Sequence, residues 1–396
     1  MENKEYSPFL GVAMLLGLFL PHISTVLMAI NPLMLLILYY FNRKRSNTSF
    51  GIVKLLICGV ILISFLYSYI SVSHESDKYI QSSVFLMMLI MFFPFTGPSK
   101  IHGSYFFIAI GFILFTQLIY LFNLPSLQAT LERLYPVEEL TANSFEYMTE
   151  NINSSNIFYF RLGGVFSNSN QSARYTCLLT AAYLADRHNE SLRKTSLYIL
   201  LAFLSVILTG SRTGLVVISL IIFVFLYRNH SIKRNLKIAL VLLVIIVLVP
   251  SFFTGSSQIR GFNVGQGFNE SANAKWYVLM DYLSQHNSAF HLLFGYSDIN
   301  TFSPSNINLL PIFDSEYGNI IYAYGFVGFI LIIILYFKAI KLCRKENRLF
   351  FIVLLWTITS TILLSYRMSF LFMLFMSHFV SLSNRSDIQH RYIYGR

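Results

Sequence analysis

The chain has 396 residues, of which 55% are hydrophobic and only 12% are charged. Soluble domains carry about 25% charged residues, so this composition excludes an ordinary water-soluble protein and indicates a polytopic membrane protein. The net charge of +11 would suit nucleic acid. However, the basic residues stand in short segments between apolar runs, so membrane topology explains them better and no nucleic-acid partner is expected.

About twelve apolar runs are long enough to cross a bilayer as helices. With both termini in the cytoplasm, most of the 29 Lys and Arg residues fall on the cytoplasmic side, as the positive-inside rule requires. One helix over residues 8–41 would far exceed the thickness of a bilayer, so Pro21-His22 is interpreted as a tight turn. The predicted spans are residues 7–21, 23–41, 50–72, 80–96, 103–124, 170–186, 195–210, 213–228, 236–253, 316–338, 348–364 and 368–384.

Two outward segments, residues 125–169 and 254–315, are much longer than the other connections. Both are rich in Asn and Ser with interspersed aromatic residues, and the second contains Trp276-Tyr277. Long loops in a compact bundle are usually functional. The pattern therefore predicts one transmembrane domain over residues 1–396, with a first outer loop and a large outer loop between the ninth and tenth helices that cover a substrate.

The outward arginines are candidates for chemistry, because the positive-inside bias does not account for them. Arg212 stands at the membrane boundary, in a Gly210–Gly214 turn that also offers the hydroxyls of Ser211 and Thr213. A guanidinium can bind two phosphate oxygens at once and keeps its charge in a low-dielectric setting. The turn therefore predicts a phosphate site, and the alternative is an arginine that only extends from a helix end to the interface.

A second basic segment ends the first outer loop and runs into the next span. Asn170 would cap that helix, and its positive end would lie near Arg161 and Arg174, which suits an anion. The alternative is a glycine-rich loop with an ordinary cap. Arg260, in the large outer loop, is a further outward arginine.

A third segment places two carboxylates, Asp314 and Glu316, at the outer mouth of an apolar helix. Partial burial there would raise a carboxylate pKa enough to make a useful general base. The alternative is that both residues only cap and stabilise the helix start. His291 is another candidate base. His286 and His291 are five residues apart and no Cys or carboxylate pair joins them, so we expect no metal site and no cofactor.

In this order, the segments resemble the bacterial family of O-antigen ligases and Wzy-type O-antigen polymerases. Members of that family carry a Gly-Gly-x-Phe-x-Asn-x-Asn-like segment before a helix, a Ser-Arg-Thr/Gly turn, a large periplasmic loop and a Tyr-Gly-x-x-Gly-like element. The corresponding segments here are Gly163–Asn170, Gly210–Gly214, residues 254–315 and Tyr324–Gly328, with Leu293–Tyr296 similar to the interior of the family's loop.

The resemblance implies an all-α, GT-C-like fold in the bacterial inner membrane and an inverting glycosyltransferase. Its donor would be a glycan on undecaprenyl pyrophosphate, and its other partners membrane lipids, a chain-length regulator and a flippase. Ligases of the family typically carry a His where this chain has Asp314-Ser315-Glu316, which favours a polymerase of O-antigen or capsule repeats. The alternatives are a ligase that transfers glycan to lipid A–core and a flippase for lipid-linked oligosaccharide.

The chemistry of these segments, together with the resemblance, predicts three groups of site residues. Those that would bind pyrophosphate are Arg212, Arg161, Arg174 and Arg260. Those that would take the proton of the acceptor hydroxyl are Asp314, Glu316 and His291. Those that would contact glycan are Trp276, Tyr277, Asn170 and Tyr317.

Overall fold

The chain forms two compact units, each built from separated stretches of sequence. The first comprises Met1–Ala29, Ser99–Phe268 and Lys345–Thr357, and the second comprises Ile30–Pro98, Asn269–Arg344 and Ile358–Arg396. The computed structural model describes residues 8–20, 51–71, 87, 90, 101–135, 162–166, 169–186, 192–228, 277, 280, 281, 284, 288–295, 316–343, 345–356 and 366–381.

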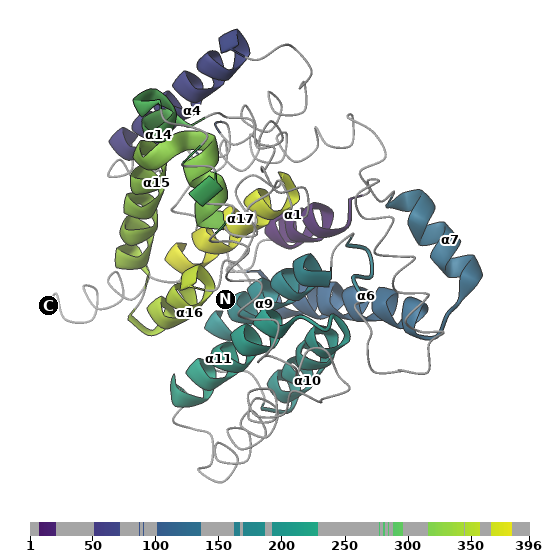
Figure 1. Ribbon diagram of the computed structural model, residues 1–396. Helices are drawn as coiled ribbons and strands as arrows, with labels where there is room; N and C mark the ends of the chain where they lie inside the picture. Colours follow the sequence, from purple (N-terminus) through teal and green to yellow (C-terminus); the bar gives the residue numbers. More distant parts are fainter. Residues whose placement is uncertain are drawn as a thin grey trace, which may run out of the picture. The chain divides into compact units, whose positions relative to one another are not determined.

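All regular secondary structure in these described residues is α-helical (Figure 1). The helices are α1 (Pro8–Phe19), α4 (Gly51–Ser71), α6 (Gly103–Leu121), α7 (Pro125–Leu134), α9 (Ser169–Asp186), α10 (Leu192–Leu208), α11 (Arg212–Arg228), α14 (Ala289–Phe294), α15 (Glu316–Leu342), α16 (Lys345–Trp356) and α17 (Tyr366–Ser381).

Most of these helices coincide with predicted spans, so the all-helical prediction is confirmed where it can be compared. By length and composition, two described helical segments, Gly103–Leu121 and Tyr317–Leu342, are apolar enough to cross a membrane, although the second is broken at Gly325. The spans predicted at 23–41 and 236–253 lie outside the described residues. The total of twelve spans, the single domain and the limits of the outer loops stay predictions.

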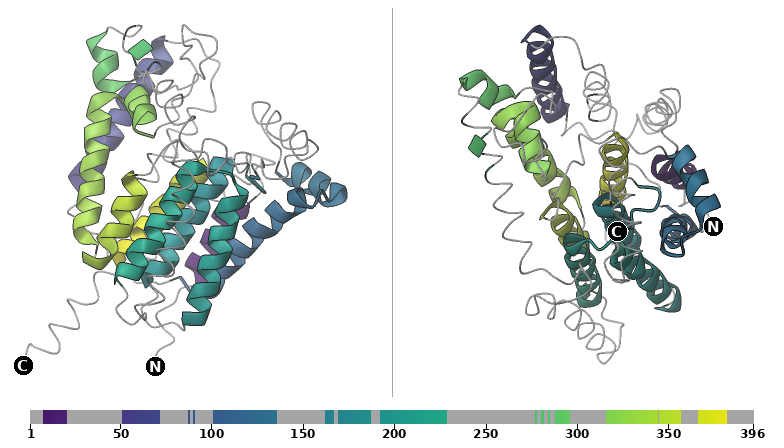
Figure 2. Two further views of the ribbon diagram at one scale, coloured as in Figure 1. Left: turned by 60° about the horizontal axis from the view of Figure 1, so that its bottom comes forward. Right: turned by 45° about the vertical axis from the view of Figure 1, so that its right-hand side comes forward.

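Helix α9 is the centre of the first unit. It contacts α6, α10, α11 and α16, and every residue from Tyr175 to Ala185 is buried. Figure 2 shows α9, α10 and α11 side by side. The packing is close where residues are small, because a Cβ on Gly214 of α11 would lie 2.7 Å from the Cβ of Ala173 on α9. Close approach through small residues is typical of membrane helices.

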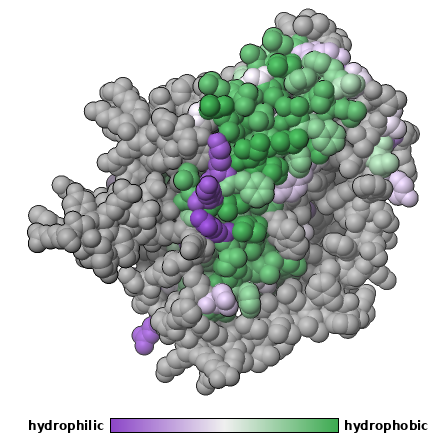
Figure 3. Space-filling model, turned by 90° about the vertical axis from the view of Figure 1, so that its left-hand side faces the viewer, coloured by the Kyte–Doolittle hydropathy of each residue, from purple (hydrophilic) through white to green (hydrophobic). Residues whose placement is uncertain are grey.

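The second unit is built on α15, which contacts α4, α14 and α17. The rings of Tyr336 on α15 and Phe372 on α17 meet edge to face at 5.8 Å. Apolar side chains also cover the outside: Ile52 of α4 is 75% exposed and Phe337 of α15 is 67% exposed. Figure 3 shows the resulting apolar surface. Extended apolar surface of this kind marks contact with lipid or protein.

The structure differs from the prediction in the first outer loop, which contains a helix. After α6 ends, Asn123 adopts a positive φ of 49° and Pro125 occupies the first turn of α7. Proline suits that position because the first N–H groups of a helix have no partner within it. The Tyr135 hydroxyl, just after α7, donates a hydrogen bond to the Phe19 carbonyl, which ties this helix to the end of α1.

Candidate functional site

The segments that contain Arg161 and Arg212 meet at the end of α10. The Leu162 N–H donates a hydrogen bond to the Leu208 carbonyl at 3.0 Å. Leu208 is the last residue of α10, where carbonyl groups lack partners within the helix. The side chains of Leu162 and Leu208 also share one buried apolar cluster with Leu114. The backbone that follows Arg161 is therefore fixed beside the turn that leads to Arg212, although Arg161 itself lies outside the described residues.

The turn between α10 and α11 is held by its own hydroxyl groups. Gly210 has a φ of 58°, in the left-handed region that favours glycine. The Ser211 hydroxyl, in a residue only 5% exposed, accepts the Gly214 N–H at 3.2 Å and so caps α11. The Ser211 oxygen thus serves as a helix cap, and because a hydroxyl can accept and donate at once, its expected role as a donor to an anion stays a prediction. Arg212 is the first residue of α11, where the helix end carries partial positive charge.

The Leu162–Phe166 segment packs tightly on α6 and α9. Gly164 has a φ of 64°, and a Cβ there would lie 2.5 Å from the Thr116 hydroxyl, so a side chain does not fit. The Phe166 ring stacks on Tyr175 of α9 with centroids 4.4 Å apart. Gly164, the second glycine of this motif, is thus required by backbone conformation and close approach.

Gln117, in the middle of α6, links this segment to α9 and α10. Its Nε2 lies 3.3 Å from the Leu162 carbonyl, 3.2 Å from the Ser205 carbonyl and 3.1 Å from the Ser172 hydroxyl. The side chain is fully buried. Because both carbonyls can only accept, the amide must present its N–H groups to them. One buried amide therefore fixes the backbone of the loop against two helices.

Asn170 and Arg174 lie at the start of α9, one helical turn apart and hence on one face. Both are half-buried. Helix α9 begins at Ser169, so Asn170 lies in its first turn and not at the cap position that we predicted. Arg174 lies in the second turn of α9, and its role beside the helix start stays a prediction.

The other candidates that the structure describes belong to the second unit. His291 is half-buried on α14, and its ring meets Tyr67 of α4 edge to face at 4.9 Å. Tyr317 is half-buried in the first turn of α15, against Phe329. Tyr277 is 65% exposed, as a residue that stacks on a sugar must be in the absence of ligand.

The remaining candidates cannot be compared in the same way. Asp314, Arg260 and Trp276 lie outside the described residues, and of Glu316 and Arg212 only the backbone is described. Across the described ranges, no three His, Cys, Asp or Glu residues gather as metal ligands would.

Replacing Gln117 with leucine is expected to lower both thermal stability and activity. The change leaves the Leu162 carbonyl without its donor, whereas the Ser205 carbonyl still accepts the Thr209 N–H, and a stranded buried polar group costs about 1–3 kcal/mol. The measurements are the unfolding temperature in detergent and the glycan made by cells. Gln128→Leu is the matched control, because that half-buried amide makes only 3.4 Å contacts. Equal unfolding temperatures for the two variants would contradict the linking role of Gln117.

Comparison with protein families identifies one matching domain. Residues 197–333 match the family described as O-antigen ligase (Wzy_C). This range starts in α10, includes Arg212 and α14, and ends in α15. The family consists of polytopic membrane proteins that transfer lipid-linked glycans. A comparison with curated proteins gave no match.

Proposed function

We propose that this chain, whose residues 197–333 match the O-antigen ligase family, polymerises glycan repeat units at the periplasmic face of the bacterial inner membrane. The growing glycan would pass from undecaprenyl pyrophosphate to the non-reducing sugar of a new lipid-linked repeat. The observation that supports this most is the Leu162–Leu208 hydrogen bond, because it joins the two segments whose arginines suit a diphosphate.

The reaction is a displacement at the anomeric carbon of the donor sugar. The acceptor hydroxyl oxygen forms the new bond, the bond from the anomeric carbon to the diphosphate oxygen breaks, and the diphosphate leaves with the electron pair. Arg212, with Arg161 or Arg174, would neutralise the charge that develops on this leaving group. A guanidinium at the start of a helix suits that role because the helix end adds partial positive charge to that of the side chain.

The hydroxyl proton must pass to a base during this displacement. The candidates are Asp314, Glu316 and His291, all in the second unit. The His291 ring contacts Tyr67, and Glu316 is the first residue of α15, whereas Asp314 lies outside the described residues. General base catalysis of this type contributes roughly 10²–10⁴-fold. Exposed Tyr277 and its neighbour Trp276 would stack on sugar faces, and Asn170 and Tyr317 would contact the glycan.

A ligase is the second candidate, since the matching domain is described by that activity. The Asp314-Ser315-Glu316 segment favours the polymerase, because it stands where ligases of this family typically carry a His. Further partners in the proposal are a chain-length regulator and a flippase. Both termini would face the cytoplasm.

A strain that lacks the gene is expected to make lipid A–core that carries a single repeat unit and no long chains. The measurement is a gel ladder of surface glycan compared with that of the parent strain. Core with no repeat unit would show a ligase. Core with no repeat, together with lipid-linked repeat retained at the cytoplasmic face, would show a flippase. An unchanged ladder would overturn the proposal for this glycan.

A further inference from the structure

The hydropathy of residues 316–338 predicted one continuous span, but helix α15 is not continuous. It is broken at Gly325, where φ is 65° and ψ is −174°. We call residues 316–324 the first limb and residues 326–342 the second limb. The rings of Tyr317 and Phe329 meet edge to face with centroids 6.0 Å apart. In a straight helix these residues would be roughly 18 Å apart along the axis. The first limb therefore folds back beside the second.

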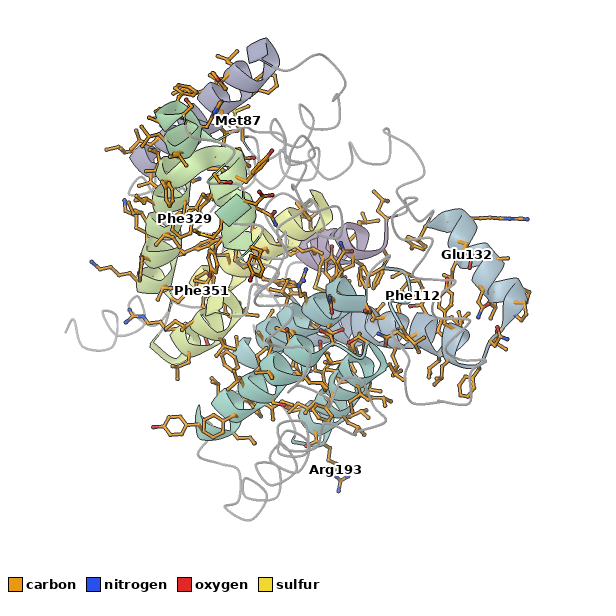
Figure 4. All side chains as sticks on the ribbon, in the orientation of Figure 1. Met87, Phe112, Glu132, Arg193, Phe329 and Phe351 are labelled. Carbon is orange, nitrogen blue, oxygen red and sulfur yellow. The ribbon has the colours of Figure 1, made fainter. Side chains whose placement is uncertain are left out.

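The figures show the same turn. In Figure 1 the ribbon of α15 bends back between its two limbs, and Figure 2 shows the limbs side by side from other directions. Phe329, labelled in Figure 4, lies one helical turn beyond the bend. The bend at Gly325 thus reverses the direction of the chain. The start of the first limb therefore lies alongside the second limb.

Two glycines make the bend a backbone-to-backbone contact. Gly295 follows α14 with a φ of 74°, and a Cβ on it would lie 2.4 Å from the Ala323 carbonyl carbon. A Cβ on Gly325 would lie 2.2 Å from the Leu293 carbonyl. Real Cβ atoms do not approach so closely, so the end of α14 and the bend of α15 can cross only through glycine.

Helix α4 supports the bend from another side. A break in a helix leaves backbone carbonyls without their usual partners, which is costly in a membrane. The Ser64 hydroxyl donates to the Ala323 carbonyl at 2.6 Å, and this bond is buried. One turn further along α4, the Tyr67 ring packs on Phe290 of α14 with centroids 4.5 Å apart. Helices α4 and α14 thus both hold the fold-back in place.

The second limb has the surface of a membrane span. It exposes Phe326, Ile330, Ile334 and Phe337, which recur at helical spacing on one face. It is roughly 25 Å long, close to the thickness of the hydrocarbon core. Lys338 and Lys341 stand at its far end, so the bend at Gly325 lies at the opposite membrane surface.

We propose that the first limb is a re-entrant helix that carries Glu316 and Tyr317 from the large outer loop back below the outer membrane surface. This rests on the proposed function for the outward orientation of the loop. The acidic end of the loop then lies below the lipid headgroups, beside the acyl chains, and not in the aqueous phase outside the membrane.

The fold-back is tested by cross-linking in membranes. In full-length protein whose three native cysteines are replaced by serine, Tyr317→Cys and Phe329→Cys are combined. A short bifunctional thiol reagent is expected to join the two cysteines in most molecules. The matched control pairs Phe329→Cys with Ser288→Cys, an exposed residue at the start of α14. Equally poor joining of both pairs would overturn the hairpin.

The depth is tested separately, with a fluorophore on Ile321→Cys of the first limb. Quenching by lipids with a nitroxide on the acyl chain is expected to match that of a label on Ile330→Cys. A label on Ser288→Cys should be quenched best by a headgroup nitroxide. If Ile321→Cys behaves like Ser288→Cys, the limb is not re-entrant. Neither experiment depends on activity, so both results stand whatever glycan profile the deletion strain shows.

Discussion

Arg212→Ala is expected to abolish long glycan chains while the protein remains in the membrane at its normal level. The guanidinium at the start of α11 would neutralise the departing diphosphate, and one such group typically contributes about 10²–10³-fold or more to the rate. The cap of α11 is provided by the Ser211 hydroxyl, which the change does not touch, so the helix should form normally. The measurements are the surface glycan ladder and an immunoblot of the membrane fraction.

The same helix offers the control for this variant. Arg228 ends α11, so Arg228→Ala removes an equal charge from the other end of the element. We expect it to keep long chains. Arg212→Lys should give an intermediate result, because an ammonium retains the charge but not the paired donors of the guanidinium. Normal ladders from Arg212→Ala would remove this residue from the mechanism.

The positions of most described helices were predictable because hydropathy reports apolar length directly. The helix α7 was missed, although Pro125 at its start and leucines at 127, 131 and 134 form a recognisable helical pattern. We interpreted that region by its polar composition, which hides a short helix whose residues are all at least partly exposed.

The sequence alone suggested that the Arg161 and Arg212 segments lie close together only because these motifs occur in the same order as in the family. The Leu162–Leu208 hydrogen bond joins backbone groups, and no side chain in the sequence signals it. Gln117 could have been found, because a buried amide within an apolar span is costly unless it has partners. Its three contacts come from the loop, α9 and α10, so their identity requires the fold.

Hydropathy could not predict the fold-back of α15, for a different reason. Both limbs are apolar, so their joint profile looks like one long span. Gly325 was part of the Tyr324–Gly328 element that the family resemblance singled out, but a glycine alone does not tell whether a helix breaks. The break depends on Gly295, thirty residues earlier in the chain and with its own positive φ. The break requires Gly295 and Gly325 together, and neither glycine alone predicts it from the sequence.

Gly325→Ala is expected to prevent correct folding of the second unit and to eliminate long glycan chains. With φ 65° and ψ −174°, Gly325 lies in a backbone region essentially restricted to glycine, which costs another residue about 1–3 kcal/mol. The added Cβ would also lie 2.2 Å from the Leu293 backbone, which is fixed, so α14 must move away from the bend. The loss of that contact adds to the cost, and the total is a large part of the stability of a typical domain. The unfolding temperature in detergent and the yield of folded protein measure the effect.

Gly59→Ala is the matched control, since Gly59 lies in α4 of the same unit and an added Cβ there meets nothing within 4 Å. Alanine in a helix interior is favoured over glycine by roughly 0.5–1 kcal/mol, so this variant should be as stable as the parent or slightly more so. Gly295→Ala should reproduce the defect of Gly325→Ala, because either methyl group forces the same two backbones apart. If Gly325→Ala unfolds at the same temperature as Gly59→Ala, the two backbones do not cross at these glycines. The fold-back of α15 then lacks its main restraint.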